Sequence, residues 1–268
     1  MGENEQGGML RTVVVVGLIA IISFVVIAAV VGIAGTSKSS QDATVSKITD
    51  AVDNIDDSSK SNYQYTYNAD KLTATIYGVA DKDAVQGKDV HIPAKVKHNG
   101  KTYTITGLGS SAFADMDITS VTIPDTVTSL GSWLFKNDKL TSVVIPSSVT
   151  TLEDGVFFNN KLTSVSLPAN LTKIGNSTFQ QNQLNSINLN NKLESIGDGA
   201  FNQNNISSLD LPDSLKRVGK WAFSQNKLTN GSVKGGRNLE SFDTSTSNAS
   251  FDVYWNGAGN KAIEPASN

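Results

Sequence analysis

Residues 140–161 read LTSVVIPSSVTTLEDGVFFNNK, and residues 162–183 read LTSVSLPANLTKIGNSTFQQNQ, so two versions of one 22-residue unit follow each other directly. The same spacing continues on both sides. Phenylalanines recur every 22 residues, at Phe113, Phe135, Phe157, Phe179, Phe201 and Phe223. The apolar residue that opens each unit recurs at the same interval, at Ile118, Leu140, Leu162, Leu184, Ile206 and Leu228. A fixed period held over six copies predicts a solenoid of stacked coils.

Each unit begins with the pattern of a short strand that has one buried face. Val165 and Leu167 alternate with Ser164 and Ser166, the period of two that a half-buried strand requires. Pro168 then ends the strand because proline cannot donate to a ladder of backbone hydrogen bonds. We expect the phenylalanine to enter the core from the other side of the coil.

Two further columns repeat with the unit. Gly175 and its equivalents are expected at a turn that needs unusual backbone dihedrals, with Glu153 as an exception that tolerates a Cβ. A polar column lies three residues after each phenylalanine, at Asp138, Asn160, Asn182, Asn204 and Asn226. This column is either a ligand-binding ridge or a structural ladder bonded to the backbone of adjacent coils, and we expect the ladder.

The consensus LTSVxIPxxVTxIGxxAFxxN, which runs through about residues 90–234, resembles the BspA-like leucine-rich repeats. The resemblance implies a solenoid with a parallel sheet on one face and turns or short helical segments on the other. It also implies display on a cell surface and, in some members, adhesion. Family members often have cysteine where this chain has its Asn column, and the resemblance supplies no catalytic residues.

An uncharged apolar segment precedes the repeats. Residues 13–35, VVVVGLIAIISFVVIAAVVGIAG, would span about 34 Å as a helix, enough to cross a bilayer. We expect a transmembrane helix that acts as an uncleaved signal anchor, with residues 1–12 as a short cytoplasmic tail and the repeats outside the cell. Secretion after cleavage near residue 35 is the alternative.

The rest of the chain divides by composition and pattern. We expect a flexible linker at 36–62, an N-terminal β cap with the first coil at 63–117, and the 22-residue repeats at 118–234. The cap contains a turn at residues 68–71, a hairpin at 98–101 and about nine extra residues between Pro93 and Ile105. A C-terminal cap and frayed tail follow at 235–268.

Composition excludes several classes of function. The chain has 268 residues with a net charge of −3, which gives no basic field for nucleic acid. It has no cysteine and two histidines, and no catalytic or metal-binding motif is recognisable. We therefore expect a non-catalytic protein without cofactor or metal.

Binding is the function that remains, through the exposed strand positions or the tryptophans. The expected outward positions are Ser142, Val144, Ser164, Ser166, Ser186, Asn188, Ser208 and Asp210. Trp133 and Trp221 share one position in the unit, and Tyr254 and Trp255 lie in the expected C-terminal cap; these aromatics either cover the core or contact a partner. We expect an extracellular protein or glycan partner, and a structural spacer or self-associating envelope component is the alternative.

Overall fold

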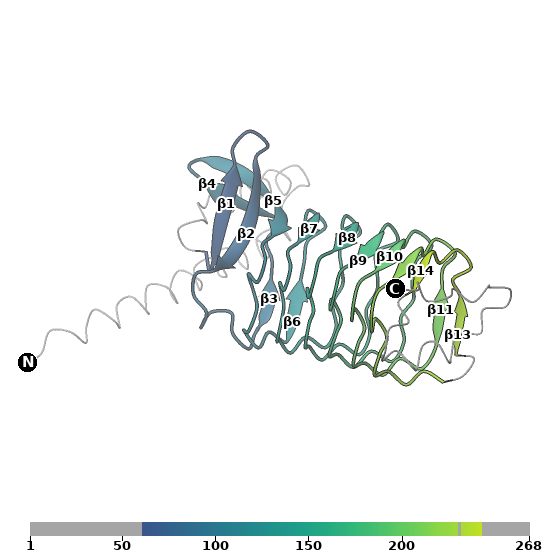
Figure 1. The fold of residues 1–268 in the computed structure, drawn as a ribbon. Helices are drawn as coiled ribbons and strands as arrows, with labels where there is room; N and C mark the ends of the chain where they lie inside the picture. The colour runs from purple at the N-terminus through teal and green to yellow at the C-terminus, as the bar shows by residue number, and fades with distance from the viewer. Residues whose placement is uncertain (1–60, 230–231, 243–268) are drawn as a thin grey trace, which may run out of the picture. The chain divides into compact units, whose positions relative to one another are not determined.

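A computed structural model describes residues 61–229 and 232–242, which form fourteen strands joined by turns (Figure 1). The strands at the N-terminal end are β1 (Tyr63–Asn68), β2 (Thr73–Val79), β3 (Asp89–His91), β4 (Lys95–His98) and β5 (Lys101–Leu108). The strands of the repeats are β6 (Ser120–Thr122), β7 (Ser129–Leu130), β8 (Thr151–Leu152), β9 (Lys173–Ile174), β10 (Ser195–Ile196), β11 (Leu209–Leu211), β12 (Arg217–Val218), β13 (Val233–Gly235) and β14 (Ser241–Phe242).

The N-terminal cap is a sheet in the order β1-β2-β5-β4, joined to the repeats where β5 pairs with β7. The hairpin between β4 and β5 turns at Asn99 and Gly100, whose φ angles of 50° and 69° suit such a tight turn. The ring of Tyr63 meets the first phenylalanine of the repeats, Phe113, edge to face at 5.7 Å. The cap therefore covers the N-terminal end of the core.

The repeats contain two separate sets of parallel strands. β8, β9, β10, β12 and β14 form one sheet, while β3 pairs with β6 and β11 pairs with β13 on another side of the coils (Figure 1). The strand predicted across residues 164–167 belongs to this second set, but in the middle coils it is reduced to one bridge between Val144 and Ser166. The regular sheet lies instead at the two residues before the glycine column. A two-residue strand is too short to show the alternation of apolar and polar residues from which a strand is predicted.

The glycine column has a different cause from the one predicted. Gly131, Gly175 and Gly197 do not have positive φ angles, whereas a Cβ on any of them would lie 2.4–2.6 Å from the preceding coil's backbone. Glycine is required here because adjacent coils approach closely. Gly131 and Gly175 each donate a hydrogen bond to the preceding coil at 2.8 Å, but Glu153, which carries a Cβ, does not. Within the described residues β7 and β8 are therefore not paired with each other, although β7 pairs with β5 and β8 with β9.

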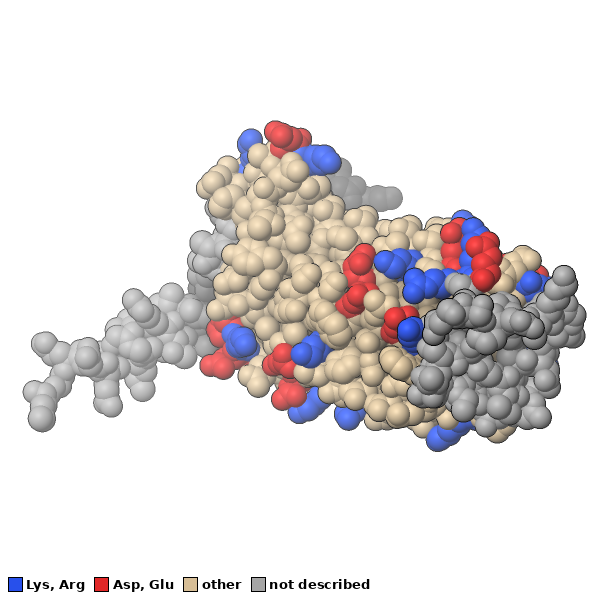
Figure 2. Space-filling model, viewed as in Figure 1, with Lys and Arg blue, Asp and Glu red and all other residues tan. Residues whose placement is uncertain are grey.

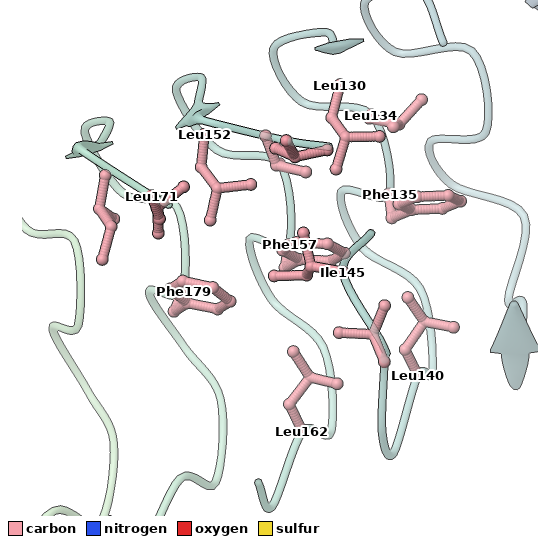
Figure 3. Packing of buried hydrophobic residues seen from close by; sticks show 14 of the residues in the cluster. Leu130, Leu134, Phe135, Leu140, Ile145, Leu152, Phe157, Leu162, Leu171 and Phe179 are labelled. Atoms are coloured by element: carbon pink, nitrogen blue, oxygen red, sulfur yellow. The ribbon is translucent and has the colours of Figure 1, made fainter. Parts of the chain in front are cut away.

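The core is a column of stacked phenylalanine rings flanked by leucine, isoleucine and valine. Successive ring centroids from Phe113 to Phe223 lie 5.1–5.9 Å apart, and successive ring planes differ by 4–22°. Figure 3 shows Phe135, Phe157 and Phe179 following one another beneath Leu152 and Leu171, all fully buried. The 22-residue period thus places identical side chains in contact.

Turns, rather than short helical segments, make up the phenylalanine side of the coils throughout the described residues. The residue two before each phenylalanine and the residue two after it have φ between 51° and 64°, as at Trp133 and Asn137. A left-handed residue interrupts a right-handed helix, so no helical turn forms. Alternate N–H groups instead donate to the next coil, as Phe135 does to the Val156 carbonyl at 2.9 Å.

The asparagine column is a structural ladder, as predicted. Asn182 Oδ1 accepts a hydrogen bond from Leu162 N at 3.0 Å, and Asn182 Nδ2 donates to the carbonyls of Phe157 and Phe179 at 2.9 and 3.2 Å. Asn160, Asn204 and Asn226 repeat this pattern. These side chains are occupied within the fold, which excludes the ligand-binding ridge.

The coils continue past residue 234, where the spacing between equivalent residues is longer than 22. β13 follows its partner β11 by 24 residues, and β14 follows β12 by the same number. Leu239 remains in the core. No helix in the described residues is long and apolar enough to cross a membrane, and the predicted span at 13–35 lies outside them, as do nearly all of the predicted linker and most of the C-terminal cap.

Candidate binding surface

The predicted strand face is exposed along its length. All eight of its predicted positions are exposed in the structure, and Val144, at 76% exposure, is the most open of the large apolar side chains described. The bridge between Val144 and Ser166 aligns these positions from one coil to the next. The face therefore presents two columns of small polar groups, interrupted by one valine and one aspartate.

A small groove lies at the C-terminal part of this face. It has a volume of about 220 Å³ and lies between Asn188 and Asp210, with Leu189 and Pro212 in its walls. Asn190, which stands where other coils have proline, bonds through Nδ2 to the Pro168 carbonyl at 2.9 Å. Sequence reasoning found Asn188 and Asp210 but missed Leu189, which is only partly buried although its position was expected in the core.

The two tryptophans of the repeats are partly exposed, at 37% for Trp133 and 43% for Trp221. The Trp133 ring packs edge to face on Phe158 at 5.6 Å and lies directly over Gly155. Trp133 therefore packs on the coil that follows it. Tyr254 and Trp255, the other predicted aromatic contacts, lie outside the described residues.

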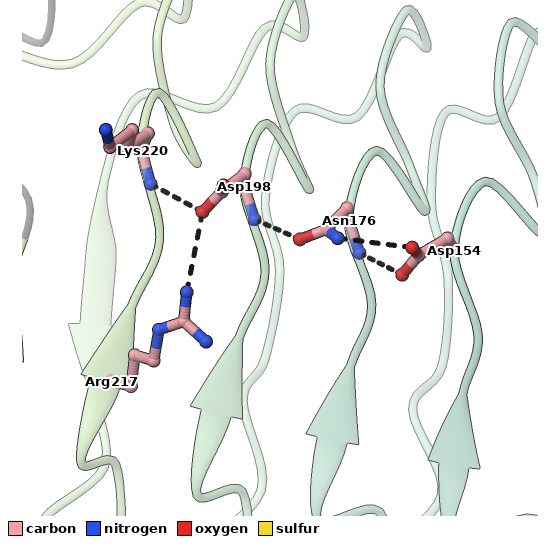
Figure 4. A network of polar contacts seen from close by, with 5 residues as sticks. All are labelled: Asp154, Asn176, Asp198, Arg217 and Lys220. Atoms are coloured by element: carbon pink, nitrogen blue, oxygen red, sulfur yellow. Dashed lines mark hydrogen bonds and ion pairs between the residues drawn. The ribbon is translucent and has the colours of Figure 1, made fainter.

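A polar ladder that sequence reasoning missed runs along the turn side (Figure 4). Asp154 Oδ1 accepts from Asn176 N at 2.8 Å, Asn176 Oδ1 accepts from Asp198 N at 2.8 Å, and Asp198 Oδ1 accepts from Lys220 N at 2.9 Å. Arg217 lies 3.8 Å from the same Asp198 oxygen. The signal was present in the sequence, because these four residues follow the glycine column at intervals of 22.

The surface carries little concentrated charge. Figure 2 shows lysine, arginine and acidic side chains in small groups of mixed sign on a mostly uncharged face. Among the residues that the structure describes, no group of three or more histidine, aspartate and glutamate side chains is placed to hold a metal ion. The arrangement offers hydroxyl and amide groups for hydrogen bonding more than it offers acid–base chemistry.

Comparison with known proteins agrees with this architecture. A leucine-rich repeat protein from Bacteroides ovatus is 25% identical with a TM-score of 0.54, over 67% of this chain and 47% of the other. The pneumococcal vaccine antigen PcpA is 26% identical with a TM-score of 0.56, over 68% and 50%. A leucine rich cell surface protein from Faecalibacterium prausnitzii is 25% identical with a TM-score of 0.51, over 65% and 53%.

The chain spans about half the length of these solved structures. A comparison with curated proteins gave no match. The family model described as the BspA type leucine rich repeat region matches residues 106–229 in six copies. Together with the stacked coils, this match shows a leucine-rich repeat architecture, in which residues 106–229 are similar to the BspA type.

Proposed function

We propose that this chain is a non-catalytic cell-surface protein whose repeats bind an extracellular protein or glycan, without cofactor or metal. The observation that carries the proposal is the exposed strand face, on which eight aligned positions lie open on a scaffold whose other polar columns are occupied by internal bonds. The likeness to a cell surface protein and to a vaccine antigen supports the location.

Residues 13–35 attach the domain to the membrane in this proposal, with residues 1–12 inside the cell and the repeats outside. The support is the uncharged 23-residue segment itself. Protease treatment of intact cells tests the topology. Digestion of the repeats before lysis is expected, whereas protection of the repeats until lysis, or their recovery in the medium, contradicts the anchored arrangement.

Binding is tested by presenting the purified full chain to arrays of glycans and matrix proteins. Saturable binding to at least one probe is expected. Replacing Ser164 and Ser166 together with lysine should weaken binding through the strand face. Replacing the exposed Gln183 and Asn185 together with lysine is the control, because it adds the same two positive charges outside the strand face. A folded chain with no saturable binding to any probe would favour the structural spacer.

The spacer is retained as the second candidate because one observation favours it. The described strand face has no aromatic side chain among its eight positions, whereas binding hot spots are rich in Trp, Tyr and Arg. A spacer requires only the stack of coils, so strand-face substitutions should then leave cell-surface behaviour unchanged.

A further inference from the structure

A second and larger groove lies on the turn side of the coils, away from the strand face. Its volume is about 570 Å³, within the range of small-ligand sites, and three successive coils supply its walls. Ser177 and Gln180 come from one coil, Gly199 and Asn202 from the next, and Trp221 from the third.

The groove exists because one column of the repeat changes side-chain size. In the column two residues before the phenylalanine, Trp133 fills the space over Gly155, where a Cβ would lie 2.1 Å from the indole ring. A Cβ at Gly199, one coil beyond Ser177, would meet nothing nearer than 3.5 Å. The volume that a tryptophan fills near the start of the repeats is therefore open beside Gly199.

Trp221 borders this space in a strained backbone conformation. Its φ is 53°, in the left-handed region, where a bulky side chain is an outlier. Gly155 and Gly199 occupy the same column at φ 64° and 60°, so glycine satisfies the backbone without strain. The half-exposed Trp221 indole is the one aromatic ring among the described residues that line the groove.

The polar groups of the groove suit a neutral, hydroxyl-rich ligand. Gln180 Nε2 donates to Asn202 Oδ1 at 3.2 Å, which leaves Gln180 Oε1 as an acceptor beside the Ser177 hydroxyl. Asp198 is the one charged side chain among the described lining residues, and Arg217 lies 3.8 Å from it. The groove therefore offers donors and acceptors with little net charge, next to one flat apolar ring.

We propose that this groove binds a neutral saccharide, with one sugar ring stacked on Trp221 and its hydroxyls bonded to Ser177, Gln180 and Asp198 Oδ2, the carboxylate oxygen that the polar ladder does not use. The apolar face of a sugar ring matches the indole, and its hydroxyls match the mixed donors and acceptors. Anionic ligands are disfavoured by Asp198, and an apolar peptide would leave the polar walls unpaired. The inference rests on the proposed binding function and assigns it a site and a ligand class.

The test presents the full chain to cello-, laminari-, malto- and chito-hexaose and to matrix proteins, followed by calorimetric titration with the best saccharide. Trp221→Ala should raise the dissociation constant by about tenfold, the effect of losing one stacked aromatic contact. Trp133→Ala is the matched control, because Trp133 has the same backbone conformation but lies over Gly155, outside the groove.

A second variant fills the groove with a larger side chain and is expected to leave the fold intact. Ser177→Trp places indole beside Gly199 as Trp133 lies beside Gly155, in a column that already accepts tryptophan at φ 53–59°. It should abolish saccharide binding while thermal unfolding stays close to that of the unmodified chain.

The outcomes separate the two proposals. Saccharide binding that is lost in Ser177→Trp, weakened in Trp221→Ala and kept in Trp133→Ala supports the groove. Binding only to matrix proteins, or saccharide binding unaffected by both groove variants, overturns the groove while the surface-binding function stands. Absence of saturable binding to every probe overturns both.

Discussion

At the scale of single residues, Asp138 is the exception in the asparagine ladder. Asp138 Oδ1 accepts from Met116 N and Ile118 N at 3.0 Å, but its buried Oδ2 has no hydrogen-bond partner in the described structure. An asparagine there would donate to the Phe113 carbonyl, as Asn160 donates to that of Phe135. Burial, opposed by these N–H groups and assisted by Asp115 and Asp117, raises the pKa of Asp138 from 3.8 to about 7.

This pKa predicts that stability depends on pH. Between about pH 4 and pH 7 the folded state holds a proton that the unfolded state has released, so the free energy of unfolding falls as pH rises. Asp138→Asn should remove this loss, which is on the order of a few kcal/mol. Denaturant unfolding at pH 5 and pH 8 measures it.

The exposed Asp125→Asn is the control for the change of charge. It should retain the pH dependence of the unmodified chain. If Asp138→Asn loses as much stability between pH 5 and pH 8 as the unmodified chain does, Asp138 is not the group responsible.

The ladder itself is tested at Asn182. Asn182→Ala leaves Leu162 N and the Phe157 carbonyl without their partner, at a cost of about 2–4 kcal/mol of unfolding free energy. Asn185→Ala, three residues away and exposed, should change stability by less than about 0.5 kcal/mol. Equal effects of the two substitutions in denaturant titrations would argue against a structural ladder.

At the scale of the element, Glu153 weakens one joint between coils. Its N–H makes no backbone bond to the preceding coil in the described structure, whereas those of Gly131 and Gly175 do. We expect the Glu153 amide to exchange with solvent about tenfold faster than the Gly175 amide, because it lacks one hydrogen bond. Hydrogen exchange followed by NMR measures both, and equal protection would show that the sheet is continuous there.

The sequence predicts those elements whose side chains repeat in register. Phe179 and Asn182 were assigned correctly because their columns recur every 22 residues, and the extra residues before Ile105 form the hairpin that their Asn-Gly pair indicates. Other features depend on distances between coils, which one unit does not reveal. The close approach at Gly175 and the groove beside Gly199 both arise between neighbouring coils.

At the scale of the whole molecule, the coils share the same core residues and differ at their exposed positions. The phenylalanine stack and the asparagine ladder are nearly uniform along the chain, so they specify the stack and carry no selectivity. Differences lie at exposed positions such as Val144, Asp210 and Trp221. Any specificity of binding must come from these differences.

The interchangeability of the coils is tested most directly by a pair of deletions. Removing residues 162–183 joins Lys161 to Leu184, which restores every column in register, whereas removing residues 162–172 shifts every later column by half a coil. The 22-residue deletion should give a folded protein that unfolds cooperatively and is shorter by about 5 Å, one inter-strand spacing, in solution scattering. The 11-residue deletion should fail to fold. Equal folding of both proteins would contradict the solenoid.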